Sequence, residues 1–135
     1  MDKKYLDILK SLVEKASKNE EVPVGAIVIY KGDIISKAYN KRNKTNNVLM
    51  HAEIDAIRKA AKKLKTWRLN DCEMIVSLKP CQMCTEIIKE SRIKNVYYLL
   101  DKEKQINNKT KFIKMTAQED AVYKQIISDF FKKKR

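Results

Sequence analysis

The chain has 135 residues, and its 30 Lys or Arg against 17 Asp or Glu give a formal net charge of +13 at pH 7. This length corresponds to one domain, spanning residues 1–135, with a single core. The residues Met1–Tyr5 lack the apolar run of a signal peptide, and no stretch approaches the roughly 20 apolar residues of a membrane span. Three cysteines, an odd number, are typical of a reducing compartment without disulfides. We therefore expect a single cytoplasmic domain.

Alternating helical and strand patterns run along the whole chain. The predicted elements are helix 2–18, strands 22–30 and 34–39, helix 51–65, strand 72–78, a helix from Cys81, strand 95–100 and helix 117–131. Residues 112–115 are a further candidate strand by their composition, and residues 40–47 are predicted to be a polar loop. This order predicts an α/β fold, a three-layer α/β/α sandwich with a mixed sheet of about five strands. Gly25, inside the first strand, indicates close approach of a ligand or of another backbone.

Two short motifs stand at the starts of two predicted helices. The first is His51-Ala52-Glu53, which contains the only histidine of the chain. The second is Pro80-Cys81-Gln82-Met83-Cys84, which follows after 26 intervening residues. Together they read H-x-E and P-C-x-x-C, a pattern that offers one imidazole, two thiolates and one further carboxylate.

We predict that His51, Cys81 and Cys84 bind one zinc ion. Three protein ligands leave the fourth tetrahedral position open for water, which is the arrangement of a catalytic zinc and not of a structural one. Helix starts favour negative charge and therefore thiolates. Two alternatives stay open: Cys81 and Cys84 could be a redox pair, or Cys72 could complete a closed structural site.

Glu53 is the predicted catalytic residue. It follows His51 by two residues in the same helical turn, so it can reach a zinc-bound water without joining the coordination shell. We expect Glu53 to take a proton from that water, deliver it to a ring nitrogen of a base and later protonate the departing amine.

The positive charge is concentrated in two places. One is a basic run without an intervening acid, formed by Arg58, Lys59, Lys62, Lys63, Lys65 and Arg68. The other is the C-terminal sequence Lys132–Arg135. Such clusters favour a phosphate-bearing partner, although biased coding would also produce a lysine-rich chain.

The two motifs match the signature of zinc nucleobase deaminases. The chain resembles the cytidine deaminase-like superfamily, and within it the bacterial tRNA-specific adenosine deaminases. Besides the motifs, the likeness includes residues 20–26, 38–40, 91–93 and 127–131. The resemblance implies a zinc-dependent, homodimeric enzyme that converts adenosine to inosine at the wobble position of a tRNA anticodon stem-loop.

The resemblance also implies which residues bind the substrate. Contacts to the target nucleoside are expected from Asn40, the backbone of Ala52, Val22 and Pro23. Contacts to the anticodon loop are expected from Phe131 and Arg135. Without the resemblance, Asn40 would be interpreted as a turn residue.

The chain departs from the family pattern in two places, and the second concerns a loop that lines the RNA groove in the family. Lys79 stands before Pro-Cys where the family has a glutamate, and no glycine follows Gly32, so the segment after Leu100 lacks the glycine-containing loop of the family. Two other functions are therefore kept. One is a deaminase of a free nucleobase or nucleoside, of the guanine or cytosine type, and the other is a non-catalytic zinc-bearing RNA-binding subunit.

Overall fold

The structure is a computed structural model that describes residues 1–101, 110–114 and 120–133. The chain divides into two units, Met1–Lys104 and Gln105–Arg135, which are described separately. The expectation of one domain over residues 1–135 stays a prediction. Arg135 and the first residues of the predicted last helix lie outside the described residues.

A mixed sheet forms the centre of the first unit. Its strands are β1 (Gly25–Tyr30), β2 (Asp33–Tyr39), β3 (Cys72–Leu78) and β4 (Asn95–Leu100), in the order β2-β1-β3-β4. The pairs β2-β1 and β1-β3 are antiparallel and β3-β4 is parallel. The mixed sheet is confirmed, but it has four strands and not about five, because residues 110–114 carry no strand in the part of the chain that is described.

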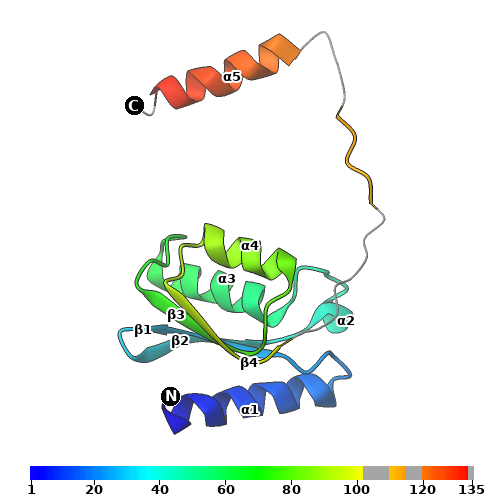
Figure 1. Cartoon of the computed structure of the whole chain (residues 1–135), viewed down its shortest axis with the longest axis vertical. Coiled ribbons are helices and arrows are strands. Elements are labelled where there is room, and N and C mark those ends of the chain that lie inside the picture. The colour runs from blue at the N-terminus through cyan, green and yellow to red at the C-terminus, as the bar shows by residue number, and fades with distance from the viewer. Residues whose placement is uncertain (102–109, 115–119, 134–135) are drawn as a thin grey trace. The chain divides into compact units, whose positions relative to one another are not determined.

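Helices cover both faces of this sheet, which confirms the three-layer α/β/α arrangement. Helix α1 (Lys3–Lys18) lies on one face, and α3 (Ala52–Leu64) and α4 (Gln82–Glu90) lie on the other (Figure 1). Helix α1 comes so close to β1 that a Cβ added to Gly25 would lie 2.8 Å from the Cβ of Leu12 and 3.3 Å from the backbone oxygen of Leu9. The close approach expected at Gly25 is therefore that of another backbone.

Helix α3 turns a row of small residues toward the sheet. The fully buried alanines are Ala52, Ala56 and Ala60. The larger apolar residues of this helix are only half-buried, and two of them, Ile57 and Leu64, pack against the core. Alanines let a helix backbone approach a sheet closely, which leaves the larger side chains at the flanks of the contact.

The segment between β2 and α3 is more ordered than the predicted loop, since it contains the short helix α2 (Arg42–Thr45). The buried carboxylate of Glu21 accepts hydrogen bonds from the backbone N–H of Asn43 at 3.1 Å and of Lys44 at 2.9 Å. The backbone N–H of Lys41 donates to the oxygen of Met50 at 2.9 Å. These bonds hold the segment that leads to His51.

The second unit contributes α5 (Asp120–Lys133). Among residues 1–101, 110–114 and 120–133, no helix combines the length and the apolar character required to pass through a bilayer.

Candidate metal centre and active site

The ends of two helices bring the zinc motifs together. His51 is the N-cap of α3 and Cys81 is the N-cap of α4, while Cys84 lies in the first turn of α4. Both helices pack on the same face of the sheet, and α4 starts shortly after β3 ends at Leu78 (Figure 1). The site therefore lies at the carboxyl end of β3.

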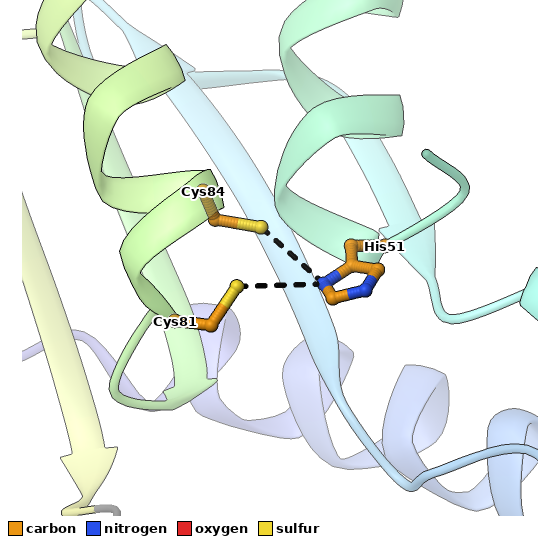
Figure 2. A group of neighbouring side chains, drawn as sticks. All are labelled: His51, Cys81 and Cys84. Atoms are coloured by element: carbon orange, nitrogen blue, oxygen red, sulfur yellow. Dashed lines mark hydrogen bonds between the residues drawn. The ribbon is translucent and has the colours of Figure 1, made fainter. Parts of the chain in front are cut away.

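The geometry of this cluster fits a single metal ion. His51 Nδ1 lies 3.4 Å from Cys84 Sγ and 3.9 Å from Cys81 Sγ, and it faces both sulfurs (Figure 2). All three ligand atoms lie within 4.8 Å of one another. Tetrahedral zinc with ordinary bond lengths places a nitrogen and a sulfur ligand about 3.6 Å apart. The three side chains are thus a binding site for one metal ion, and one imidazole with two thiolates is a donor set of zinc.

Cys72 does not take part in this cluster. It is buried at the first residue of β3, whereas the cluster lies beyond the last residue of that strand. A closed structural site completed by Cys72 is therefore wrong.

Burial controls the acidity of the inner ligand. It raises the pKa of the Cys84 thiol well above its usual range, and the nearby Glu53 carboxylate and Cys81 raise it further. In the metal-free protein, burial therefore opposes the thiolate that the start of the helix favours. A cation bound between the ligands has to stabilise this thiolate.

Glu53 lies beside the metal-binding cluster. Its side chain is only 4% exposed, and it is close enough to Cys84 to hydrogen-bond to that thiol. The structure thus places the carboxylate beside the ligands, on the same helix as His51 and two residues further along the chain.

The structure brings two of the predicted substrate residues into direct contact. Asn40 is buried, and its side-chain Oδ1 accepts a hydrogen bond from the backbone N–H of Ala52 at 2.8 Å. The backbone N–H of Asn40 donates to the oxygen of Val24 at 3.1 Å. Asn40 therefore caps the start of α3, and its Nδ2 is the group that can donate to a ligand.

The remaining predicted contact residues are spread over both units. Val22 and Pro23 are exposed and precede Val24, whose oxygen holds Asn40. Phe131 lies on α5 in the second unit and is 60% exposed. Arg135 lies outside the described residues.

Sequence reasoning missed the buried acid Asp55, which is 1% exposed. Its carboxylate is ion-paired with Arg58 at 2.7 Å, Lys59 at 3.2 Å and Lys41 at 3.7 Å. Burial by itself raises the pKa of Asp55, but the bonds from Arg58 and Lys59 and the charges of Lys59 and Lys41 lower that pKa overall. The only signal in the sequence is one acid directly before the basic run, and two cations of that run share this acid as an ion-pair partner.

The fold and the His51, Cys81 and Cys84 cluster define a zinc-dependent deaminase of the cytidine deaminase-like type. The model of the MafB19-like deaminase family matches residues 1–135, and the chain belongs to this family.

The chain is similar to two kinds of deaminase, which act on tRNA and on guanine. The tRNA-specific adenosine deaminase of Aquifex aeolicus (strain VF5) is 35% identical over 150 residues, covering 100% of this chain and 97% of that protein. A solved tRNA:A34 deaminase, of a kind that edits A to I at the wobble position, is 32% identical with a TM-score of 0.73, covering 75% of this chain and 73% of its own. Guanine deaminase from Bacillus subtilis is 26% identical with a TM-score of 0.83, covering 96% and 95%.

Proposed function

We propose that this protein catalyses the hydrolytic deamination of adenosine to inosine at the wobble position of a tRNA anticodon. The observation that carries the proposal is the three-ligand cluster with the buried Glu53 beside it. Similarity over the whole chain to a tRNA-specific adenosine deaminase supports RNA as the substrate.

Zinc bound by His51, Cys81 and Cys84 supplies the acidity that makes hydroxide available near neutral pH. Glu53 accepts the proton that water loses and passes it to the ring nitrogen next to the attacked carbon. It then carries the second proton to the amino group, so that one water enters and one ammonia leaves. Asn40 donates from Nδ2 to the target nucleoside, and Val22 and Pro23 contact its exposed side.

The RNA partner is proposed to be the anticodon stem-loop. Bases of a single-stranded loop can be splayed out at small cost, as chemistry on a base requires. The exposed lysines of the basic run, Lys62, Lys63 and Lys65, are suited to its phosphates. Phe131 is proposed to stack on a base of the loop, and Arg135 to pair with a phosphate.

We also propose that the enzyme is a cytoplasmic homodimer. Two apolar side chains just before the metal ligand His51 are strongly exposed, Val48 at 58% and Leu49 at 50%. Exposed apolar groups beside a site are suited to contact with a second chain. Sedimentation velocity of the zinc-loaded protein is expected to give twice the chain mass, and a monomer at micromolar concentration would contradict this.

Deamination of a free base is the second candidate. The likeness to guanine deaminase extends over 96% of the chain, more than the 75% covered by the tRNA:A34 deaminase. The net charge of +13 favours the RNA, because a small neutral base does not require it.

The test uses one enzyme preparation and three substrates. The zinc-loaded protein is incubated with an anticodon stem-loop carrying adenosine at the wobble position, and separately with free adenosine and with guanine. We expect inosine in the RNA and no ammonia from the small molecules. Ammonia from guanine alone would establish the second candidate, and RNA binding without conversion would identify a non-catalytic subunit.

A further inference from the structure

Asp55 is a charged residue on the face of α3 that is otherwise filled by alanines. It lies one turn after His51, and its backbone N–H donates to the oxygen of His51 at 3.0 Å. Burying a carboxylate costs free energy unless charges and hydrogen bonds compensate for its lost hydration. Asp55 has three such cations, and they come from two different segments of the chain.

The two carboxylate oxygens of Asp55 have different partners. Oδ1 accepts from Arg58 Nη2 at 2.7 Å and from Arg58 Nε at 3.2 Å, so this side stays within α3. Oδ2 is ion-paired with Lys59 at 3.2 Å and with Lys41 at 3.7 Å. Lys59 also donates to the backbone oxygen of Lys37 in β2 at 3.0 Å. Oδ2 therefore joins α3 to Lys41, which lies two residues after the edge strand β2. Through Lys59, it is also connected to β2 itself.

Lys41 is fixed at several points. Its Nζ lies 4.7 Å from the centre of the Tyr39 ring, in addition to its ion pair with Asp55. Its backbone N–H donates to the oxygen of Met50, which closes the segment between β2 and α3. Only 22% of its side chain is exposed. These contacts fix the chain at the residue that directly follows Asn40.

Asn40 in turn contacts the start of α3. Ala52 is the first residue of the helix, so its N–H has no acceptor within the helix and depends on Asn40 Oδ1. Asp55 follows Ala52 by three residues and thus lies on the neighbouring part of the same helix surface. One surface of α3 consequently holds Asn40 directly, through Ala52, and indirectly, through Asp55 and Lys41.

We propose that Asp55 is a positioning residue, which acts through Lys41 to hold the Asn40 side-chain amide in register with the first N–H of α3. The consequence for catalysis rests on the proposed function, because it requires that Asn40 faces the target nucleoside. The consequence for structure does not, since the hydrogen bond from Ala52 to Asn40 is present without RNA.

A purely electrostatic role for Asp55 makes the opposite forecast for RNA. Replacing the acid with a neutral amide adds one positive charge to the protein and releases Lys41, Arg58 and Lys59 for phosphates. On that view Asp55→Asn binds RNA more tightly and reacts at least as fast as the parent. If Asp55 is a positioning residue, Asp55→Asn should instead deaminate bound RNA more slowly than the parent.

The experiment uses the full-length zinc-loaded chain and measures hydrogen exchange of the Ala52 amide by NMR, relative to that of the Ala60 amide in the same helix. The ratio removes any general loss of stability. The test variants are Asp55→Asn and Lys41→Met. The matched control is Arg58→Met, which removes the shortest ion pair of Asp55 but leaves Lys41 in place.

We expect Asp55→Asn and Lys41→Met each to raise the exchange ratio by about tenfold. The variant that carries both substitutions should raise it no more than the larger of the two single effects, because the two residues act in one chain of contacts. Arg58→Met should leave the ratio within about twofold of the parent. Asp55→Asn should also lower the single-turnover rate with saturating enzyme by about tenfold, without weakening RNA binding.

Two results would overturn the proposal. One is an unchanged ratio in Lys41→Met, which tests the link even if Asp55→Asn does not fold. The other is an equal rise in Arg58→Met, which would mean that Asp55 only stabilises the helix. If the parent fails to deaminate the RNA, the proposed function is wrong, while the exchange ratios still decide the role of Asp55.

Discussion

At the scale of single residues, the proposed chemistry depends on Glu53, a carboxylate that is not one of the three metal-binding side chains. Glu53 is buried beside Cys84, whereas His51, Cys81 and Cys84 provide the metal-binding atoms. Metal binding and proton transfer are thus assigned to different side chains. Substituting Glu53 should therefore affect proton transfer without removing the metal-binding atoms.

Glu53→Gln keeps the size of the side chain but cannot accept a proton. We expect bound zinc and thermal stability close to those of the parent, and a turnover rate lower by about 10²–10⁴-fold, the usual contribution of general acid–base catalysis. Zinc content by atomic absorption and single-turnover kinetics measure the two effects. A zinc-loaded Glu53→Gln protein with the parent rate would remove the role assigned to Glu53.

Zinc uptake is predicted to release protons and to weaken as the pH falls. In the metal-free protein the pKa of Cys84 is raised by burial, by Glu53 and by Cys81, so this thiol is protonated at neutral pH and must lose its proton to bind metal. Calorimetric titration with zinc in two buffers of different ionisation enthalpy should give different apparent enthalpies. Equal enthalpies in both buffers would show that no proton is released.

At the scale of elements, four of the strands and the metal ligands were predictable because their signals are local, although β1 begins at Gly25 and not at residue 22. The bounds of β3 and β4 agree with the predicted 72–78 and 95–100, and the two zinc motifs each fall within five residues. The buried face of α3 was not predictable from its pattern, because Ala52, Ala56 and Ala60 carry little hydrophobic signal. Asp55 and Glu21 were missed because their burial depends on partners brought close only by the fold.

The contact between α1 and β1 is predicted to tolerate no side chain at Gly25. In Gly25→Ala the new Cβ would lie 2.8 Å from the Cβ of Leu12, so α1 has to move away from the sheet. We expect the free energy of unfolding to fall by about 1–3 kcal/mol, as for other overpacked cores. Urea unfolding measures the change.

Gly32 provides the matched control for Gly25. It has a left-handed φ of +83°, but a Cβ added there would meet no other atom within 4 Å. Gly32→Asn should therefore cost less than Gly25→Ala, since asparagine adopts left-handed backbone readily. A larger loss for Gly32→Asn would mean that turn geometry, and not helix approach, limits this region.

At the scale of the whole molecule, the net positive charge is large, but not every cation is equally available to bind phosphate. Arg58 and Lys59 are tied to Asp55, while Lys62 and Lys63 of the same helix are exposed. The sequence shows the amount of charge but not which cations already have acidic partners. A phosphate-binding surface is therefore better assigned to the exposed lysines than to the whole basic run.

Affinity for the anticodon stem-loop is predicted to fall steeply with salt, and Lys62 and Lys63 are predicted to account for part of that slope. Replacing both with Gln should reduce the slope of log K against log salt by about 1.4, near 0.7 for each single-strand phosphate that the variant no longer neutralises. The control changes net charge equally on the opposite face of the sheet, where α1 carries the exposed Lys10 and Lys18 (Figure 1). Fluorescence anisotropy over a salt series compares the two pairs, and an equal decrease in slope from both would mean that RNA responds only to total charge.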